Sequence, residues 1–338
     1  MRVLLTGGAG YVGSACFRAF RRQGIDAFVL DDLSEGHRGA VEADRLDVAD
    51  LRDTDAVARV LRDRDITHVV HFAAKTSVPN SIGDPSGYWS SNVDGSRSLL
   101  EAMRATGVGR IVFSSTAAVY AHGFDRLIRE TDPIAPATPY GTSKLAVEHL
   151  LQGYAEAYGM GTTALRYFTA CGAEDDGAHG EAHREETHVI PLLIQTGLGQ
   201  RAAFKVFGNV WDTPDGSCIR DFVSVQDLAS AHLLALQNLE LGKMERYNLG
   251  TGSGTSVLGL LSAAERVFGH PIAHSMEAPR PGDPALLVAD STKAQEKLGW
   301  RPQHSSIDDI LATALAWHSG RGRTGYSDVV PLRPAMSA

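Results

Sequence analysis

The feature that most constrains the fold is a glycine-rich turn near the start of the chain. Residues 2–6 form a short apolar segment of strand character, the sequence GGAGYVG follows at once from Gly7 to Gly13, and a helical pattern then begins. In such a turn Gly7 permits a tight bend, Gly10 lets the backbone approach a pyrophosphate, and Gly13 lets the helix pack against the strand. The helix N-terminus offers unpaired N–H groups to phosphates. The segment therefore predicts a dinucleotide-binding site.

A carboxylate follows the second apolar segment, at a position suited to ribose recognition. Residues 27–30 are apolar and end in Asp31, about 20 residues after the glycines, where a carboxylate can bind a ribose diol. No arginine stands next to Asp31 to bind a 2′-phosphate. The sequence therefore favours NAD over NADP.

The composition excludes several classes of protein. The chain has 338 residues, 43% of them hydrophobic and 21% charged, which is ordinary for a globular protein of about two domains. The formal net charge is −8 without a basic stripe, so nucleic acid is not an expected partner. The three cysteines lack CxxC spacing, and the N-terminus is already a strand rather than a signal peptide. No apolar segment approaches the ~20 residues that span a bilayer. We therefore expect a cytoplasmic protein without disulfides or a membrane partner.

The first half of the chain alternates between strand and helix patterns. Strand-like apolar segments occur at residues 3–6, 27–30, 68–72, 110–114 and 163–166. Helical patterns lie between them at residues 11–23, 51–64, 85–106 and 139–158. This alternation predicts an α/β fold with a doubly wound parallel (Rossmann) sheet, whose strands all end at one edge where ligands bind.

The pattern changes after residue 168. The later part has shorter elements and clusters of glycine and proline, which is typical of a smaller α+β region that forms a substrate cleft. We expect three parts: an NAD-binding domain over residues 1–168, a substrate-binding region over residues 169–318 and an exposed tail over residues 319–338. Segments near 218–250 are expected to return to the first domain, because residues 221–223 and 247–249 have strand character.

A tyrosine and a lysine stand four residues apart at the start of a predicted helix. Pro139 favours a helix start, so Tyr140 and Lys144 share one helix face. An ammonium group beside a phenol favours the phenolate and lowers the phenol pKa, which suits a base near neutral pH. The alternative is an ordinary surface pair. The dinucleotide turn and the hydroxyl residues from Ser114 to Thr116 at a strand end favour a catalytic pair.

The order of short motifs along the chain resembles that of a known family. The motifs are TGGAGYVGS at residues 6–14, LDDLSEGHR at 30–38, HFAAKTSV at 71–78, SSTAAVY at 114–120, PYGTSK at 139–144, LRYF at 165–168, DGSCIRDF at 215–222, YNLGTG at 247–252 and PRPGDP at 279–284. With these motifs the chain is similar to the extended short-chain dehydrogenase/reductase family from Met1 to about Trp317. Within that family it is similar to the sugar-nucleotide epimerases.

The resemblance implies an enzyme that inverts C4 of a UDP-sugar with tightly bound NAD. UDP-glucose and UDP-galactose are the expected pair, with a transient 4-keto sugar between them. The resemblance implies that Tyr140 exchanges the proton of the 4-hydroxyl, that Lys144 lowers the pKa of Tyr140 and binds the nicotinamide ribose, and that Thr116 orients the hydroxyl. Related proteins pair two helices of each subunit in a homodimer, which we expect here too.

The resemblance also implies two sets of binding residues. Those expected to bind NAD are Gly7, Gly10, Tyr11, Val12, Gly13, Asp31, Asp32, Leu33, Asp47, Val48, Phe72, Ala73, Ala74, Lys75, Asn92, Ser114, Tyr140, Lys144 and Tyr167. Those expected to bind the UDP-sugar are Thr116, Tyr140, Phe168, Thr169, His188, Val189, Lys205, Phe207, Arg220, Arg280, Asp283 and Leu287. Arg220 and Arg280 are expected to hold the diphosphate, since the guanidinium fork suits phosphate oxygens.

Three positions bear on the substrate. Thr169 stands where the family commonly has an asparagine that contacts the nucleotide phosphate, which leaves the substrate pose open. Leu287 is intermediate in size at the position that discriminates plain from N-acetylated hexoses. Thr116 replaces the more frequent serine and keeps the hydroxyl.

Histidines outside these motifs are expected to be structural. His179 and His183 are four residues apart among acidic residues, but Gly177 and Gly180 disfavour a rigid helix there. We expect a solvated loop that partly covers the nucleotide and no metal site. His71 is expected to be a packed residue at a strand end rather than a base.

Three other interpretations remain open. The UDP-sugar can be an N-acetylhexosamine, a pentose or a uronic acid. A nucleotide-sugar dehydratase needs an acid–base pair after Thr116, where this chain has Ala117 and Ala118. A non-catalytic NAD(H)-binding protein would tend to lose the pair of Tyr140 and Lys144, which this chain retains.

Overall fold

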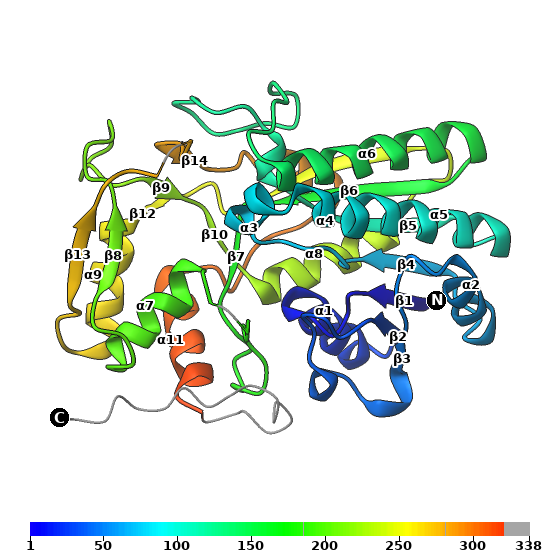
Figure 1. The fold of residues 1–338 in the computed structure, drawn as a ribbon, viewed down its shortest axis with the longest axis horizontal. Helices are drawn as coiled ribbons and strands as arrows, with labels where there is room; N and C mark the ends of the chain where they lie inside the picture. The colour runs from blue at the N-terminus through cyan, green and yellow to red at the C-terminus, as the bar shows by residue number, and fades with distance from the viewer. Residues whose placement is uncertain (185, 281, 321–338) are drawn as a thin grey trace.

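The computed structural model describes residues 1–184, 186–280 and 282–320. Its centre is a seven-stranded sheet with the strand order β11-β6-β5-β4-β1-β2-β3 (Figure 1). The strands are Arg2–Thr6 (β1), Asp26–Asp31 (β2), Leu46–Val48 (β3), His68–His71 (β4), Arg110–Thr116 (β5), Gly161–Tyr167 (β6) and Met244–Leu249 (β11). All neighbouring strands in this sheet are parallel, so the predicted doubly wound α/β fold is confirmed.

Helices cover both faces of the sheet. On one face pack α2 (Thr54–Asp63), α5 (Gly95–Thr106) and α6 (Pro139–Tyr158). On the other face pack α1 (Tyr11–Arg22) and α8 (Val225–Gln237). Successive side chains of a strand point to opposite faces. Val3 and Leu5 of β1 therefore join one apolar core and Leu4 joins the other.

Local sequence sets the helix ends close to the predicted ones. The Thr138 hydroxyl accepts a hydrogen bond from the Gly141 nitrogen (3.2 Å), and Pro139 occupies the first turn, so α6 begins where predicted. The Asp53 carboxylate accepts from the Ala56 nitrogen (2.9 Å). This cap starts α2 at Thr54, three residues after the predicted position 51.

The structure differs from the sequence prediction in the short elements. The five predicted strands are present, with ends shifted by at most two residues. The helix predicted over 85–106 is divided into α4 (Pro85–Tyr88), a π-helical segment (Trp89–Asp94) and α5. The short elements α3 (Val78–Gly83) and β3 were not predicted, because neither carries an apolar period long enough to detect.

The chain beyond β6 forms a smaller region beside the sheet (Figure 1). Its elements are β7 (Thr169–Cys171), α7 (Val189–Gly197), β8 (Phe204–Phe207), β9 (Ile219–Arg220), β10 (Phe222–Ser224), β12 (Thr255–Ser256), α9 (Val257–Phe268), β13 (His274–Glu277), β14 (Leu286–Leu287) and α11 (Ile307–His318). Helix α10 (Thr292–Lys297) instead packs against β11 of the main sheet. The strands form three small sheets, β10-β7, β12-β9-β14 and β13-β8. Helices α7, α9 and α11 enclose an apolar core of their own.

Part of the later chain returns to the main sheet. Helix α8 packs on the sheet, and β11 pairs with β6 at its edge. The strand expected at 221–223 differs, since β10 pairs with β7 and not with the main sheet. This follows from the bend after β6, where β7 leaves the sheet and β10 runs beside it. Of the predicted tail over 319–338, residues 321–338 lie outside the described residues.

Two predictions from composition can be compared with the fold. In the described part of the chain, every helix is too short or too polar to cross a membrane. Cys16, Cys171 and Cys218 are buried free thiols, as expected for a chain without disulfides.

Candidate active site

The glycine turn between β1 and α1 has the shape of a phosphate cradle. Gly7 has a φ of +68°, and a Cβ there would lie 2.4 Å from the backbone nitrogen of Ala73. A Cβ on Gly13 would lie 2.4 Å from the carbonyl oxygen of Gly7. Gly10 caps α1, and the first turn of α1 contains no acidic residue that would compete with an anion for its N–H groups. The turn therefore fits a pyrophosphate, with Tyr11 and Val12 at the helix start.

Asp31 lies at the end of β2 as a buried carboxylate. Its two oxygens accept hydrogen bonds from the backbone nitrogens of Ala9 (2.9 Å) and Leu33 (2.8 Å). Burial raises the pKa of this carboxyl, and the two backbone donors act against that rise. Each oxygen has two lone pairs, so acceptor capacity remains for the two hydroxyls of a ribose. The residues present therefore fit an unphosphorylated adenine ribose.

Four other residues predicted to bind NAD lie in or beside β2 and β3, near Asp31. Asp32 and Leu33 follow β2 directly, and Leu33 has a left-handed backbone with φ of 60°. Asp47 and Val48 lie in β3, the neighbour of β2. Asp47 forms an ion pair with Arg64 (3.1 Å), and Val48 is exposed. The structure therefore gathers these four residues at one corner of the sheet.

A hydrogen-bonded path leads from the glycine cradle to α6. The backbone from Phe72 to Lys75 follows β4 and includes Ala73, the neighbour of Gly7, and Ala74. The Asn92 side chain accepts from the Lys75 nitrogen (2.8 Å) and donates to the Lys75 carbonyl oxygen (3.1 Å). It also donates to the Ser143 hydroxyl (2.9 Å) on α6. Asn92 is buried in the π-helical segment, so it holds three elements of the candidate site together.

Tyr140, Lys144 and Thr116 meet at the carboxyl end of β5. Tyr140 and Lys144 lie in the first two turns of α6, and Thr116 is the last residue of β5. Lys144 is 1% exposed. Its ammonium donates to the Ser114 carbonyl oxygen (2.8 Å) and lies 4.8 Å from the centre of the Phe113 ring. The structure thus brings together the three residues predicted to act on the sugar hydroxyl.

The predicted effect of Lys144 on Tyr140 is not seen in this structure. Although part of Tyr140 is exposed, the surrounding protein raises the pKa of its phenol to about 12, with Thr116 acting in the opposite direction. Burial lowers the pKa of Lys144 to about 7. The expected lowering of the phenol pKa is therefore wrong for the protein alone, because desolvation is the largest effect on both groups.

Tyr167 and His71 are held in buried hydrogen bonds. The Tyr167 hydroxyl lies 2.6 Å from His232 Nε2, and His232 Nδ1 lies 2.8 Å from the Leu228 carbonyl oxygen. Because a carbonyl only accepts, Nδ1 carries the proton and Tyr167 donates to Nε2. His71 is hydrogen-bonded to Thr6 (2.7 Å), and burial lowers its pKa to about 3. His71 is therefore a packed residue, as predicted.

The predicted substrate residues form two groups in the smaller region. In one, the Arg280 guanidinium lies 3.8 Å from the centre of the Phe207 ring. In the other, Arg220 forms an ion pair with Asp283 (3.4 Å), and Leu287 pairs with Arg220 across β14 and β9. Lys205 is an exposed residue of β8, and Thr169 opens β7.

A small apolar cluster links the substrate residues to the catalytic strand. Phe168 and Leu287 both pack against buried side chains that include Ala117 and Tyr120. Ala117 follows Thr116 directly, so the predicted sugar-specificity position, Leu287, lies against the segment that follows Thr116, the residue predicted to orient the sugar hydroxyl.

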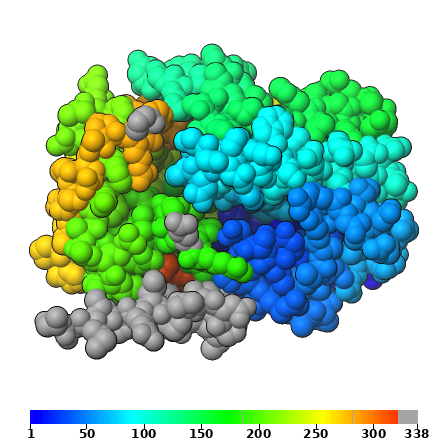
Figure 2. All heavy atoms as spheres, viewed as in Figure 1, coloured from blue at the N-terminus to red at the C-terminus, as the bar shows by residue number. Residues whose placement is uncertain are grey.

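Residues 172–184, here called the covering loop, connect the smaller region to the dinucleotide side. The Tyr11 hydroxyl donates to the Gly172 carbonyl oxygen (2.6 Å), and His37 Nε2 lies 2.6 Å from the Ala182 carbonyl oxygen. Glu174 forms ion pairs with Arg18 (2.8 Å) and Arg22 (2.6 Å) of α1. Figure 2 shows this part of the chain in green against the blue N-terminal residues.

The covering loop is not the solvated segment that its composition predicts. Glu174, His179 and Glu181 are all buried, although Glu185 lies outside the described residues. Asp175, Asp176 and Arg184 are exposed. The buried residues of the loop are held by donors on α1 and by Trp317, whose Nε1 donates to the backbone carbonyl oxygen of Glu181 (2.8 Å). The burial of Glu174 and Glu181 depends on partners that lie far away in the sequence. The residues next to them in the sequence do not indicate that these two side chains are buried.

His188, Glu181 and His183 form a compact cluster at the start of α7, just before Val189. One oxygen of Glu181 lies 2.9 Å from His188 Nδ1 and 3.0 Å from His183 Nε2. Burial lowers the pKa of His188, but Glu181 and Glu186 outweigh burial and raise it to about 10. The three side chains thus form one cluster whose candidate ligand atoms lie within 4.8 Å of one another.

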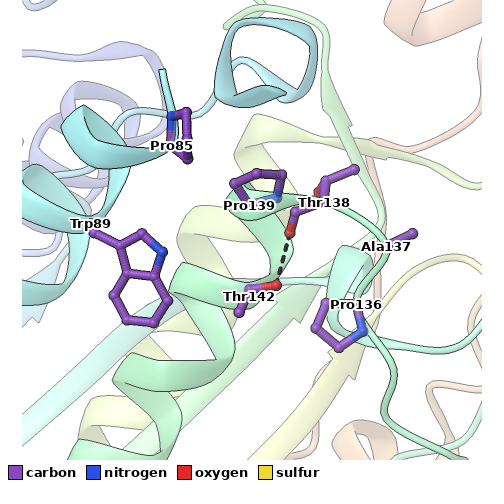
Figure 3. A pocket seen from close by; sticks show the side chains of 7 residues that line it. All are labelled: Pro85, Trp89, Pro136, Ala137, Thr138, Pro139 and Thr142. Carbon is purple, nitrogen blue, oxygen red and sulfur yellow. Dashed lines mark hydrogen bonds between the residues drawn. The ribbon is translucent and has the colours of Figure 1, made fainter. Parts of the chain in front are cut away.

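A pocket of about 330 Å³ lies beside the start of α6 (Figure 3). Pro85 and Trp89 line one side, and residues 136–139 with Thr142 line the other. The Thr142 hydroxyl donates to the Thr138 carbonyl oxygen (3.0 Å) within its wall. Its lining contains no titratable side chain, so this pocket is not the predicted reaction site.

Comparison with known proteins agrees with this geometry. The model of the family described as NAD dependent epimerase/dehydratase matches residues 3–250. The chain is 44% identical to the UDP-glucose 4-epimerase of Lactobacillus helveticus over 330 residues, which is 97% of this chain and all of that protein. It is 43% identical to the enzyme of the same name from Streptomyces lividans, over 97% of this chain and 98% of that protein.

Solved structures show the same similarity. The UDP-glucose 4-epimerase of Brucella ovis in complex with NAD matches with a TM-score of 0.89 and 39% identity, over 93% of this chain and 97% of that one. The enzyme of the same name from Bifidobacterium longum, in complex with NAD+ and UDP, matches with a TM-score of 0.89 and 32% identity, over 95% and 98%. This chain therefore belongs to the NAD-dependent epimerase/dehydratase family, within the extended short-chain dehydrogenases/reductases.

Proposed function

We propose that the protein interconverts UDP-glucose and UDP-galactose by inverting C4 of the hexose with bound NAD. One observation carries the proposal. The glycine cradle and the group formed by Tyr140, Lys144 and Thr116 lie at the same carboxyl edge of one sheet, joined through Asn92. The named activity of relatives that match over nearly the whole chain supports the same substrate pair.

NAD, when bound, supplies a reversible acceptor for the C4 hydride. Tyr140 removes the proton of the 4-hydroxyl, and the Thr116 hydroxyl orients that oxygen. Lys144 holds a positive charge near the phenolate when it is protonated, and so stabilises the charge that Tyr140 acquires. Tyr140 would return the proton to the C4 oxygen when the alcohol is formed again.

The smaller region holds the nucleotide. Arg220 and Arg280 bind the diphosphate, since each offers a guanidinium at the candidate cleft. Phe207, His188 and Val189 flank the uracil. Binding is strongest at the nucleotide, which takes no part in the reaction, so the keto sugar is free to turn over between the two hydride transfers.

The dehydratase alternative is disfavoured by the segment after Thr116. That reaction needs an additional acid and base, and Ala117 and Ala118 supply neither. Ala117 is also buried in the small apolar cluster, so it leaves no room at its position for a charged side chain.

We further propose a cytoplasmic homodimer that serves galactose metabolism. Helices α5 and α6 lie side by side on one face of the sheet (Figure 1). Trp89 and Tyr158, near their ends, are 42% and 55% exposed, which a second copy could cover. Light scattering after size-exclusion chromatography measures the mass of the assembly, and a mass near 36.2 kDa would contradict the dimer.

The activity is tested with the purified protein and no added cofactor. We expect nicotinamide absorbance in the sample and conversion of UDP-galactose to UDP-glucose, resolved by chromatography. A panel of UDP-N-acetylhexosamines, UDP-pentoses and UDP-uronic acids defines the substrate. Turnover of one of these with no turnover of UDP-galactose would replace the proposed substrate, and release of water would indicate a dehydratase.

A further inference from the structure

A buried polar network lies directly beside the proposed catalytic group. Glu148 of α6 is fully buried, and Arg166 of β6 is 2% exposed. The Glu148 carboxylate accepts from Arg166 Nε (2.9 Å) and Nη2 (2.7 Å), a two-pronged ion pair. It also accepts from the Ser115 hydroxyl (2.6 Å) and from Arg246 Nε (3.1 Å). Four donors thus satisfy one carboxylate inside the protein.

The network continues across three strands. Ser115, Arg166 and Asn248 stand opposite one another in β5, β6 and β11. Arg166 Nη1 donates to the Tyr120 hydroxyl (2.8 Å), which in turn donates to the Asn248 oxygen (2.6 Å). The Asn248 amide nitrogen donates to the Ile128 carbonyl oxygen (2.8 Å). Through Glu148, this network connects α6 to the sheet at residues that lie one position before the last residue of β5, β6 and β11.

The network shares its helix and its strand with the candidate catalytic residues. Glu148 lies four residues after Lys144 and eight after Tyr140, so the three side chains share one face of α6. On β5, Lys144 contacts Ser114, Glu148 contacts Ser115, and Thr116 follows. Two consecutive residues of β5 therefore accept hydrogen bonds from, or donate them to, two residues on the same face of α6.

The ion pair allows only one placement of α6. A shift by one residue would move the helix about 1.5 Å along its axis and turn it by about 100°. Such a shift would take Glu148 away from all four donors and leave buried charges unpaired, which is strongly unfavourable. Apolar side chains in the same place would tolerate sliding, because dispersion contacts have little directionality.

We propose that Glu148 and Arg166 are positioning residues for the 4-epimerisation. Their ion pair sets the register of α6 on β5 and β6, and this register places the Tyr140 hydroxyl beside Thr116. The effect on catalysis rests on the proposed function, whereas the register of α6 is a property of the fold and does not depend on that function. Glu148 and Arg166 act through α6, without contact to the sugar.

The test replaces both charges together, in the variant E148M/R166M. Removing both partners eliminates the two fully buried charges, and Arg246, whose side chain is 27% exposed, keeps its hydrogen bonds to Gln152, so we expect the variant to fold, to retain NAD and to keep a Tm close to that of the wild type. We expect kcat with UDP-galactose to fall by about 10- to 100-fold, since small displacements of a reacting group have large effects. KM should change by less than about threefold, because the nucleotide contacts are elsewhere. Amide hydrogen exchange in residues 139–148 should become faster.

The control variant is D227N, on the opposite face of the sheet. Asp227 is buried in α8 and accepts from the backbone nitrogens of Gln303 (2.8 Å) and His304 (2.9 Å). D227N should lower Tm and leave kcat and the exchange of residues 139–148 unchanged. If D227N reduces kcat as much as E148M/R166M does, the effect is general destabilisation and the proposal fails.

The single variant S115A keeps the proposal testable if E148M/R166M does not fold. It removes one donor to Glu148, so kcat should fall by a smaller factor, about 3- to 10-fold, with faster exchange in residues 139–148. Unchanged kcat and unchanged exchange in either folded variant would overturn the proposal. A wild-type protein inactive on UDP-galactose would contradict the proposed function instead, and the exchange measurement would still decide whether the pair sets the register of α6.

Discussion

At the scale of single residues, burial in the candidate catalytic group favours the neutral forms of Tyr140 and Lys144, compared with the same side chains in water. Burial raises the pKa of Tyr140 to about 12 and lowers that of Lys144 to about 7. A neutral phenol beside a lysine that can gain or lose its proton near neutral pH suits a site that must pass a proton both ways.

Replacing Tyr140 by phenylalanine removes the proposed base and leaves the ring in place. We expect Y140F to retain NAD and UDP binding and to lose about 10²- to 10⁴-fold in kcat, the range that a positioned proton-transfer group contributes. Turnover of UDP-galactose and the absorbance of bound cofactor measure the two properties. Near-normal turnover would remove Tyr140 from the proposed mechanism.

Replacing Lys144 by methionine should stabilise the cofactor-free protein near neutral pH. The pKa of Lys144 is about 7 in the folded protein and about 10.5 when unfolded, so the unfolded state binds the extra proton between these values. Folding is therefore penalised fully below pH 7, by roughly 3–6 kcal/mol, and the penalty disappears as the pH rises towards 10.5.

The measurement is the free energy of unfolding of K144M and wild type from pH 6 to 10. The advantage of K144M should be largest at pH 6 and should shrink steadily with rising pH. A constant difference across this range would mean that Lys144 titrates normally in the folded protein.

The sequence predicted which residues form this group but not their protonation. The spacing of Tyr140 and Lys144 on one helix face, and the position of Thr116 at a strand end, are local properties that a pattern can reveal. The pKa shifts arise from burial and, for Tyr140, also from the hydrogen bond with Thr116, and only the folded chain brings these surroundings together.

At the scale of elements, the turn between β1 and α1 depends on the absence of side chains. Gly7 has a left-handed φ of +68° and lies so close to Ala73 that a Cβ would contact backbone at 2.4 Å. Gly24, at the end of the same helix, has a similar φ of +73° and open space around it. Comparing substitutions at Gly7 and Gly24 therefore distinguishes the effect of backbone strain from the effect of steric overlap.

We expect G7A to lose bound NAD and G24A to keep it. Alanine at a left-handed position costs about 1 kcal/mol in each case, but only G7A also displaces the backbone at Ala73. The ratio of nicotinamide to protein in purified samples measures the effect, and we expect at least a tenfold difference, which is about 1.4 kcal/mol. Equal NAD content in both variants would show that the turn does not form the cradle.

Helices and strands were predicted correctly where apolar residues repeat regularly over a long segment. Elements whose conformation depends on tertiary contacts were not. Apart from β3, the strands of the main sheet and helices α1, α2 and α6 were predicted because their apolar residues recur at regular spacing. The π-helical segment from Trp89 to Asp94 has no such signature, and it is held by Asn92, whose partners lie on two other elements. β10 was assigned to the main sheet because a strand pattern does not identify its neighbour.

At the scale of the whole molecule, the covering loop joins the two halves of the protein. Glu174 is its strongest attachment to α1, since the buried carboxylate pairs with both Arg18 and Arg22. Composition predicted this loop to be solvated, because polar residues are usually exposed, and the charge pairs that bury it come from residues more than 150 positions away.

We expect E174Q to release NAD about tenfold faster than the wild type and to lose about 1–3 kcal/mol of stability, because two guanidinium groups lose their carboxylate. Exchange of bound cofactor against labelled NAD gives the rate. The control is E240Q, which removes an exposed pair with Lys243 and should change neither property. Equal release rates in E174Q and E240Q would show that the loop does not retain the cofactor.

The partners of the covering loop are synthesised at different times. The cradle and β1 to β6 are complete at residue 167, but the loop is finally held by Trp317, near the end of the chain. At synthesis rates of about 5–20 residues per second, roughly 8–30 seconds pass between these two points on the ribosome. During this interval the covering loop lacks its Trp317 partner, and only its contacts with the N-terminal elements, such as those of Glu174 with Arg18 and Arg22, can hold it in place.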